Sequence, residues 1–323
     1  MLPSATIPSK DKYKVKNWKA YNRSLVQRGS ISIWLEDSVL RQWRDISKEK
    51  KVVGECLYGD SVIQCCLLLG QVYHQPLRQT TGFVSSLLVM LGHKDYAVPD
   101  YSTLCRRQSC LPVAVSQALA GTSHLNIAID STGLKVYGEG EWKVRKHGAS
   151  KRRTWRKLHI GIDVHTQEIV LVELTSNGED DAALASKLLQ GQSHKLSSFR
   201  GDGAYDDLKL RQTLGNGVKQ IIPPPKDAVV RKGTKKKPLP EYLQQRNQAV
   251  AFIQQQGSKA WKIKEGYHQR SLNEVAMFRY KNTFSAQMKT RNMENQKTEV
   301  KLKCKILNTF RQKGMPLAYK AAA

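Results

Sequence analysis

The stretch Leu125-Asn126-Ile127-Ala128-Ile129-Asp130 decides the fold of this chain. Apolar and polar side chains alternate along it, which is typical of a β-strand with one buried face. The strand is expected to end at Asp130, because the following residues, Ser-Thr-Gly, favour a turn. A carboxylate at the carboxyl end of a strand lies at the rim of a sheet, where it is open to a ligand.

The segments on either side of this stretch continue an alternation of strands and helices. A hairpin of two strands is expected next, followed by a helix, a strand that leads into Asp202, a second helix, a last strand and a long helix around Glu274. The expected ranges are 157–164, 168–175, 180–190, 198–201, 205–214 and 218–222. This order is that of a ribonuclease-H-like fold. We therefore predict a mixed α/β catalytic domain over residues 121–318.

An insertion at about 223–260 interrupts this predicted domain. It begins Pro-Pro-Pro, continues with several basic residues and becomes rich in Gln. The composition is typical of a solvated, mobile segment. Two interpretations remain open, a plain disordered linker and a loop that contacts phosphates near the active site.

Residues 1–120 form a separate, mainly helical region that we interpret as DNA-binding. A basic arm with a short strand at 31–35 is expected first. Three helices follow, one from Asp60 or Ser61 to Val72, one over 76–91, and a short one capped by Asp100 or Ser102. Residues 76–108, which hold the last two of these helices, resemble a helix-turn-helix. The last helix carries Arg106 and Arg107 as candidate DNA contacts. A compact helical bundle that never touches DNA would give the same pattern.

The charge of the chain indicates a polyanionic partner. Lys and Arg number 53 against 27 Asp and Glu, a net charge of +26. Such an excess is typical of proteins that bind nucleic acid. Without an apolar run of about 20 residues or the apolar core of a signal peptide, a membrane partner is not expected and the chain is predicted to be cytoplasmic. Cys65 and Cys66 lie in an apolar run and are expected in the core.

Three carboxylates could hold the metal ions that phosphodiester cleavage uses. Such chemistry needs acidic side chains from separate elements around ions about 3.5–4 Å apart. Asp130 and Asp202 end two strands that are neighbours in the ribonuclease-H-like order, and Glu274 comes from the closing helix. Each acid alone has a simpler explanation as a turn residue or a solvated helix residue. Together they predict a catalytic, metal-binding triad.

The sequence around Glu274 places further polar side chains on the same helix face. At about 100° per residue, Tyr267, Arg270, Glu274 and Lys281 fall within about 60° of one another. Arg270 and Lys281 could hold phosphates, and Tyr267 could contact the sugar-phosphate backbone or stack on a base. The alternative is a ladder of ion pairs within the helix.

A strongly basic loop between Trp142 and Lys157 is a further candidate for DNA contact. Basic residues beside aromatic ones suit a DNA backbone with unstacked bases. The alternative is a solvated hairpin whose tryptophans pack inward. The predicted contacts are Trp142, Lys143, Arg145, Lys146, Arg152, Arg153 and Arg156.

The spacing Tyr-x2-Arg-x3-Glu-x6-Lys at Tyr267, Arg270, Glu274 and Lys281 resembles the signature of DDE transposases encoded by bacterial insertion sequences. The contexts Asp130-Ser-Thr-Gly and Gly201-Asp202-Gly-Ala-Tyr-Asp206 are similar to those of insertion-sequence family five, as is the opening Tyr-Lys-Val-Lys-Asn-Trp.

This resemblance implies an enzyme that binds terminal inverted repeats, frees 3′ hydroxyls and joins them to target DNA. It implies two Mg²⁺ ions at Asp130, Asp202 and Glu274, which Mn²⁺ can replace. Two DNA ends must be brought together, so a homodimer or a larger synaptic complex is expected. A nuclease that only hydrolyses and a non-catalytic DNA-binding regulator remain the alternatives.

Overall fold

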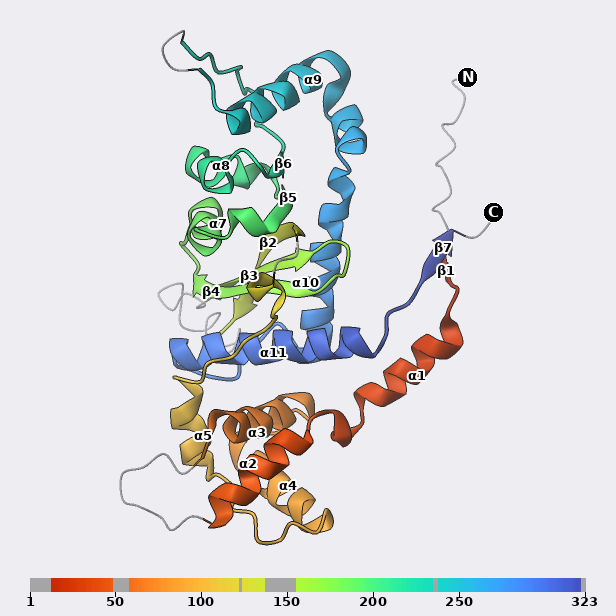
Figure 1. Ribbon diagram of the computed structural model, residues 1–323, viewed down its shortest axis with the longest axis vertical. Coiled ribbons are helices and arrows are strands. Elements are labelled where there is room, and N and C mark those ends of the chain that lie inside the picture. The colour runs from red at the N-terminus through yellow and green to blue at the C-terminus, as the bar shows by residue number, and fades with distance from the viewer. Residues whose placement is uncertain (1–12, 49–57, 122–123, 137–154, 235–237, 321–323) are drawn as a thin grey trace, which may run out of the picture.

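The computed structural model describes residues 13–48, 58–121, 124–136, 155–234 and 238–320. A mixed β-sheet lies in the middle of the molecule, with helices on both faces and a group of N-terminal helices at one end (Figure 1). The fold is therefore mixed α/β with a mainly helical N-terminal part, as predicted.

The central sheet has five strands in the described part of the chain, in the order β4-β3-β2-β5-β6. Strands β2, β3 and β4 are antiparallel neighbours, whereas β5 and β6 run parallel to β2. The strands are β2 (Leu125–Lys135), β3 (Trp155–Asp163), β4 (Ile169–Ser176), β5 (Leu196–Arg200) and β6 (Lys219–Ile221). This is the ribonuclease-H-like order that the sequence predicts.

Strand β2 is longer than predicted. It continues past Asp130 to Lys135, because β3 pairs with it as far as Lys135 opposite Trp155. The prediction that the strand ends at Asp130 was therefore wrong, and the Ser-Thr-Gly that suggested a turn is extended backbone. Asp130 is a partly buried residue inside the strand rather than one at its tip.

Alternate residues of β2 belong to two different hydrophobic cores. Leu125, Ile127 and Ile129 pack with α7 (Asp181–Leu189) and α8 (Leu208–Leu214) on one face of the sheet. Ala128 belongs to the core that contains α10 (Ser271–Phe284) and α11 (Met293–Lys313) on the opposite face. Because side chains alternate along a strand, Asp130 faces the same side as Ala128. It therefore points toward α10.

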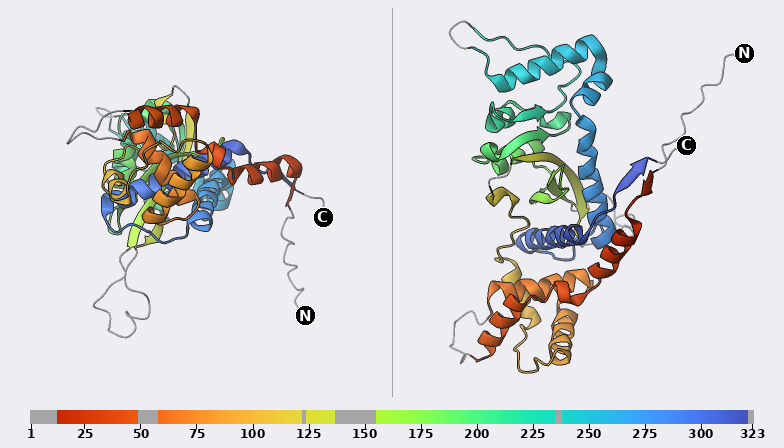
Figure 2. Two further views of the ribbon diagram at one scale, coloured as in Figure 1. Left: turned by 90° about the horizontal axis from the view of Figure 1, so that it is seen from below. Right: turned by 45° about the vertical axis from the view of Figure 1, so that its right-hand side comes forward.

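The insertion is an ordered helix in its second half, and the prediction of a solvated, mobile segment was wrong there. Helix α9 (Glu241–Lys264) changes direction at Gly257, whose φ of 83° favours glycine. Its buried residues include Leu243, Val250 and Trp261. The helix leads through the 3₁₀ turn η5 (Tyr267–Arg270) directly into α10. Figure 2 shows this run of helices along one side of the sheet.

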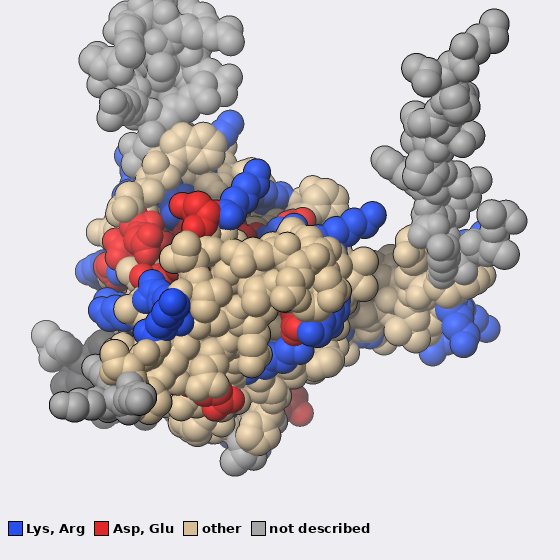
Figure 3. All heavy atoms as spheres, turned by 90° about the horizontal axis from the view of Figure 1, so that it is seen from above, with Lys and Arg blue, Asp and Glu red and all other residues tan. Residues whose placement is uncertain are grey.

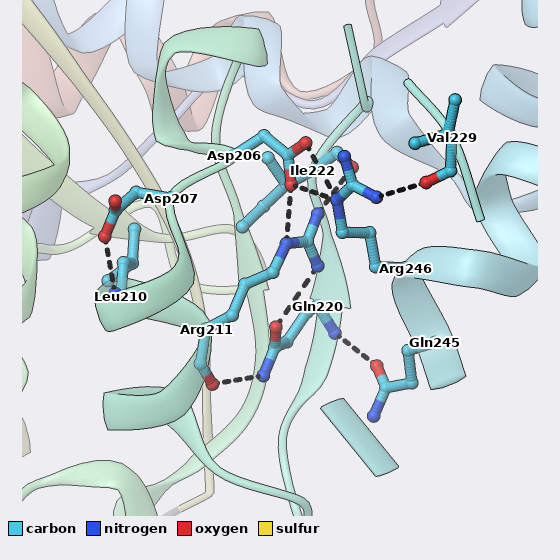
Figure 4. A network of polar contacts seen from close by, with 9 residues as sticks. All are labelled: Asp206, Asp207, Leu210, Arg211, Gln220, Ile222, Val229, Gln245 and Arg246. Atoms are coloured by element: carbon cyan, nitrogen blue, oxygen red, sulfur yellow. Dashed lines mark hydrogen bonds and ion pairs between the residues drawn. The ribbon is translucent and has the colours of Figure 1, made fainter. Parts of the chain in front are cut away.

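A buried network of charged and amide side chains fastens the insertion to the core (Figure 4). The Asp206 carboxylate accepts hydrogen bonds from Arg211 Nε at 2.7 Å and from Arg246 Nε of α9 at 3.1–3.2 Å. Arg211 also donates to Gln220 Oε1 and to the Ile222 carbonyl. Arg246 donates in turn to the carbonyl of Val229, so both halves of the insertion meet this network.

The N-terminal part is a group of helices, α1 (Trp18–Arg28), α2 (Asp37–Lys48), α3 (Asp60–Val72), α4 (Leu77–Met90) and α5 (Tyr101–Gln108). The last three match the predicted helices, and Asp100 caps α5 by accepting from the Ser102 amide. The strand predicted at 31–35 was wrong: residues 31–33 form a 3₁₀ turn, η1. Its neighbour Trp34 is buried, so tertiary packing overrides the local β preference.

Cys65 and Cys66 of α3 are buried in the core, as predicted. Short strands β1 (Tyr13–Val15) and β7 (Ala318–Lys320) pair beside α1, joining segments from the two ends of the chain (Figure 1). The remaining 3₁₀ turns are η2 (Ala118–Ala120), η3 (Ser193–Lys195) and η4 (Gly203–Tyr205). Within the described ranges, no helix combines the length and apolar character needed to cross a membrane.

Candidate active site

Strand register brings Asp130 and Asp202 to the same region. Strands β2 and β5 are parallel neighbours, and Ala128 lies opposite Arg200. Asp130 follows Ala128 by two residues, and Asp202 follows Arg200 by two residues. The two segments are neighbours and run in the same direction. Asp202 caps η4 by accepting from the Ala204 amide at 2.9 Å, which fixes its carboxylate just beyond the end of β5.

Helix α10 is fixed to the sheet by a buried amide. The Asn273 Nδ2 group donates to the carbonyl of Ala128 on β2 at 2.8 Å and to that of Ile160 on β3 at 2.7 Å. Asn273 is fully buried, so each of these bonds contributes on the order of 1 kcal/mol and leaving either carbonyl unpaired would cost more. The next residue is Glu274, whose position beside β2 therefore follows from this anchor.

Arg270 connects two of the three candidate catalytic carboxylates. Its Nη1 lies 2.8 Å from Asp130 Oδ2, and its Nη2 lies 2.6 Å from Glu274 Oε1. Charge-assisted hydrogen bonds of this kind are the stronger ones in proteins. The guanidinium thus holds a positive charge between a strand residue and a helix residue that are far apart in the sequence.

The charges of Asp202 and Glu274 both act on Asp130. Burial raises the pKa of Asp130, and the charges of Asp202 and Glu274 add to the rise, whereas the Ser131 amide and Arg270 lower it. Among the described residues, no three His, Cys, Asp or Glu side chains lie near enough to hold a metal ion in their present positions. In this arrangement the Arg270 guanidinium binds two of the three candidate carboxylates, those of Asp130 and Glu274.

A further acid, Asp181, lies beside the Asp130 strand and contacts its neighbour Ser131. Ser131 Oγ donates to Asp181 Oδ2 at 3.2 Å, and Asp181 Oδ1 lies 3.0 Å from Lys157 Nζ and 3.1 Å from His159 Nδ1. Burial lowers the pKa of His159 to about 4, although Asp181 opposes this, so the imidazole is neutral at pH 7. Asp181 is therefore held by Lys157 and Ser131 at the first turn of α7.

Tyr205 supports the turn that carries Asp202. Its ring packs so closely on Gly201 that a Cβ there would lie 2.8 Å from ring atoms, which explains the glycine before Asp202. Its hydroxyl is buried and has no hydrogen-bond partner among the described residues. Burial raises the pKa of Tyr205, and the charges of Asp181, Asp130 and Asp202 raise it further. The phenol is therefore a neutral group beside the acidic centre.

Lys281 and Tyr267 contact neighbours of the candidate acids, Thr132 on β2 and Arg270. Lys281 Nζ donates to Thr132 Oγ1 on β2 at 2.6 Å. Tyr267 precedes the α-helix, in η5, so the prediction that all four residues of the signature share one continuous helix was wrong. Its ring still lies 5.9 Å from the Arg270 guanidinium, and burial together with Asp202 raises the pKa of its hydroxyl.

Other predicted DNA contacts have structural partners or lie outside the described residues. Arg107 pairs with Asp60 and donates to the Tyr58 carbonyl, which ties α5 to α3. Arg156 donates to Gln296 Oε1 at 3.0 Å. Arg106 lies on an exposed surface, where its Nη2 donates to Thr103 Oγ1 at 3.5 Å. The remaining candidates, Trp142, Lys143, Arg145, Lys146, Arg152 and Arg153, fall in the segment that the structure does not describe.

The surface seen from above carries acidic and basic side chains side by side. Asp and Glu atoms gather in one area, and Lys and Arg atoms border it (Figure 3).

Sequence reasoning missed several residues that build this site. Asn273 was overlooked although an amide at a core position of a helix is a signal for a buried hydrogen bond. Asp206, which fastens the insertion to the core, has arginine partners 5 and 40 residues away, and no local pattern connects them. The sequence indicates only a helix start at Asp181.

Comparison with known protein families gives the decisive match. Residues 121–309, more than half of the chain, match the family described as transposase DDE domain, and residues 26–139 match a second family with the same description. The chain belongs to the DDE transposases. Enzymes of this family cleave DNA and transfer its strands, and the matched range of the larger family contains Asp130, Asp202 and Glu274.

The transposase is also similar to a solved structure, a cryo-EM structure of the piggyBac transposase synaptic complex with hairpin DNA. The two chains are 12% identical, and the match covers 89% of this chain and 82% of the other at a TM-score of 0.27. At that TM-score the likeness carries no argument about the fold or the assembly of this transposase.

Proposed function

We propose that this transposase cuts the ends of an insertion sequence and joins the freed 3′ hydroxyls to target DNA, with Asp130, Asp202 and Glu274 as its catalytic carboxylates. The observation that supports the proposal is that Arg270 bonds to both Asp130 of β2 and Glu274 of α10, while Asp202 follows β5, the strand beside β2. We further assign the enzyme to insertion-sequence family five, on the signature at Tyr267, Arg270, Glu274 and Lys281.

The donor set fits a hard divalent cation. Carboxylate oxygens are the ligands that Mg²⁺ prefers, and no thiol or imidazole competes within the triad. Asp130, Asp202 and Glu274 would hold two Mg²⁺ ions, for which Mn²⁺ can substitute. When bound, the ions supply activation of the attacking oxygen and stabilisation of the leaving oxygen.

Arg270 connects the resting arrangement with the DNA-bound one. In the structure its guanidinium neutralises Asp130 and Glu274. In our proposal it leaves the carboxylates when cations arrive and binds a DNA phosphate, for which its planar fork is suited. Lys281 and Tyr267 would hold the neighbouring part of the strand. Arg270 would therefore offset the negative charge of Asp130 and Glu274 until substrate and cations are present together.

The wider DNA interface is proposed from charge. Arg106 on exposed α5 and the basic loop containing Arg145 and Lys146 would contact the terminal repeats, which fits the net charge of +26. Arg107 and Arg156 already have structural partners and are weaker candidates than Arg106. Because two DNA ends have to be joined in one reaction, we propose a homodimer or a larger synaptic complex as the active form.

The test is strand transfer by purified protein on a labelled duplex that carries its own terminal repeat, in Mg²⁺. Joined products are expected from the wild type and not from Asp130→Asn, Asp202→Asn or Glu274→Gln, while DNA binding survives. Matched controls are Asp207→Asn and Glu294→Gln, which change carboxylates that only cap helices or pair on the surface.

The outcomes separate the candidate functions. Hydrolysis without joining would identify a nuclease and overturn the strand-transfer proposal. Binding without either reaction would leave a DNA-binding protein, and the catalytic roles would have to be abandoned. Loss of activity in the two control variants as well would show that the assay reports general damage rather than catalysis.

A further inference from the structure

Helix α10 exposes an aromatic ring beside Glu274. The side chain of Phe278 is 64% exposed, whereas the other aromatic residues of α10, Tyr280 and Phe284, are buried. Phe278 follows Glu274 by four residues, which is about 6 Å along the helix axis and about 40° around it. An exposed phenylalanine therefore lies on the same face as the candidate catalytic acid, one turn farther along.

Cationic side chains flank this ring along the helix. Arg270, one turn before Glu274, contacts both Glu274 and Asp130. Lys281, three residues after Phe278, reaches Thr132 on β2. On one face the order is therefore guanidinium, carboxylate, aromatic ring and ammonium group. A nucleotide strand presents phosphates and bases in a similar alternation, and base–aromatic stacking does not depend on base identity.

The surroundings of Phe278 do not fit a protein partner. On α10, which the structure describes throughout, the large apolar side chains that are exposed are Phe278 and Val275, at 64% and 38%. Ser271 and Asn282, near them on the same surface, are exposed and polar. A stable protein interface buries about 800 Å² on each partner around an apolar core. Two apolar residues among polar and charged ones do not supply such a core.

We propose that Phe278 stacks on a base of the DNA strand whose phosphodiester lies at the carboxylate site. The ring would hold an unpaired or displaced base next to the bond that is cut, while Arg270 and Lys281 contact the phosphates on either side. This inference rests on the proposed function and adds to it a residue that positions the substrate through its base. Stacking needs no hydrogen bond, so it would serve repeats and target DNA of different sequence.

The test uses binding, with the terminal-repeat duplex as the probe and Ca²⁺ in place of Mg²⁺ to prevent cleavage. Phe278→Ala should bind roughly 5- to 150-fold more weakly, the range expected for losing one base–aromatic stack. Phe278→Trp should restore binding because it keeps a ring. Val275→Ala, the matched change one turn earlier on the same exposed surface, should bind as the wild type does.

A series of duplexes with one abasic position each makes the test specific. The wild type should lose affinity at one or two positions next to the cut, and Phe278→Ala should lose nothing more at those positions. Equal binding of Phe278→Ala and the wild type to the intact duplex would overturn the inference. So would an equal abasic penalty in both proteins, or a change of oligomeric state in Phe278→Ala measured by light scattering.

Failure of this inference can be told from failure of the proposed function. A wild type that joins DNA ends in Mg²⁺, with Phe278→Ala joining and binding equally well, contradicts only the role of Phe278. A wild type that binds but never cuts contradicts the catalytic proposal. Melting curves of Phe278→Ala should match the wild type, because a ring that is 64% exposed contributes little to the core.

Discussion

Replacing Asp206 by Asn should destabilise the protein far more than the same change at the next residue. The Asp206 carboxylate is 2% exposed and faces Arg211, 1% exposed, and Arg246, 10% exposed. Burial lowers the pKa of Arg211, and Asp206 is the main group that opposes this. Removing one partner of a buried ion pair costs about 3–5 kcal/mol, because the remaining charge stays buried without compensation.

Asp207→Asn is the control. Asp207 caps α8 by accepting from the Leu210 amide, and asparagine caps helices about as well as aspartate. The control should therefore change the free energy of unfolding by less than about 0.5 kcal/mol. At about 2 °C per kcal/mol for a chain of this size, Asp206→Asn should lower the melting temperature by roughly 6–10 °C.

Urea unfolding followed by circular dichroism would measure both changes. In Arg246→Met, the further cost of Asp206→Asn should be smaller than in the wild type, because one of its two cationic partners is already gone. Equal melting temperatures for Asp206→Asn and Asp207→Asn would refute the reasoning. So would a full, additive loss in the double variant.

Four further results are expected. Asn273→Leu should lower the free energy of unfolding by about 1–3 kcal/mol, because it leaves two strand carbonyls unpaired, and calorimetry against Asn282→Leu on the exposed face would show it. The pKa of His159 in the folded protein is about 4, below its unfolded value. Its contribution to the free energy of unfolding is therefore complete above about pH 6.5 and is lost as the pH falls toward 4. His159→Gln should flatten that part of a plot of melting temperature against pH. Mg²⁺ at 100 times its dissociation constant should stabilise the wild type by about 2.7 kcal/mol, and a shift of the same size in Asp202→Asn would contradict the triad. Arg270→Gln should bind Mg²⁺ about 5-fold more tightly while losing strand transfer, since it no longer competes for Asp130 and Glu274.

The order of the strands could be predicted because it depends on local patterns. Leu125 to Asp130 alternates with a period of two, and the hairpin and helices after it carry equally clear patterns and caps. The end of β2 could not be predicted in this way. It depends on Trp155 pairing with Lys135 across the intervening segment, and that pairing leaves no trace in the residues of β2 themselves.

The insertion was misjudged because polar contacts hold it. Its basic and Gln-rich stretches favour a solvated segment. In the fold, however, Leu243 and Val250 are buried, Arg246 bonds to Asp206, and Gln245 accepts from the backbone amide of Gln220. Single-sequence patterns register burial of apolar side chains and do not register a buried ion pair between distant residues. Likewise, the spacing around Glu274 indicates that residue as a candidate catalytic acid. The contact of Arg270 with Asp130, 140 residues away, can be seen only in the folded chain.

The way α10 and α11 cover one face of the sheet has a consequence for the protein while it is being synthesised. Strands β2 and β3 leave the ribosome well before these helices, with Ala128, Leu158 and Ile160 on a face that only the last part of the chain will cover. A nascent or truncated product ending before residue 271 would therefore combine an exposed apolar sheet with an incomplete set of acids. Such a fragment should aggregate and should be unable to cut DNA.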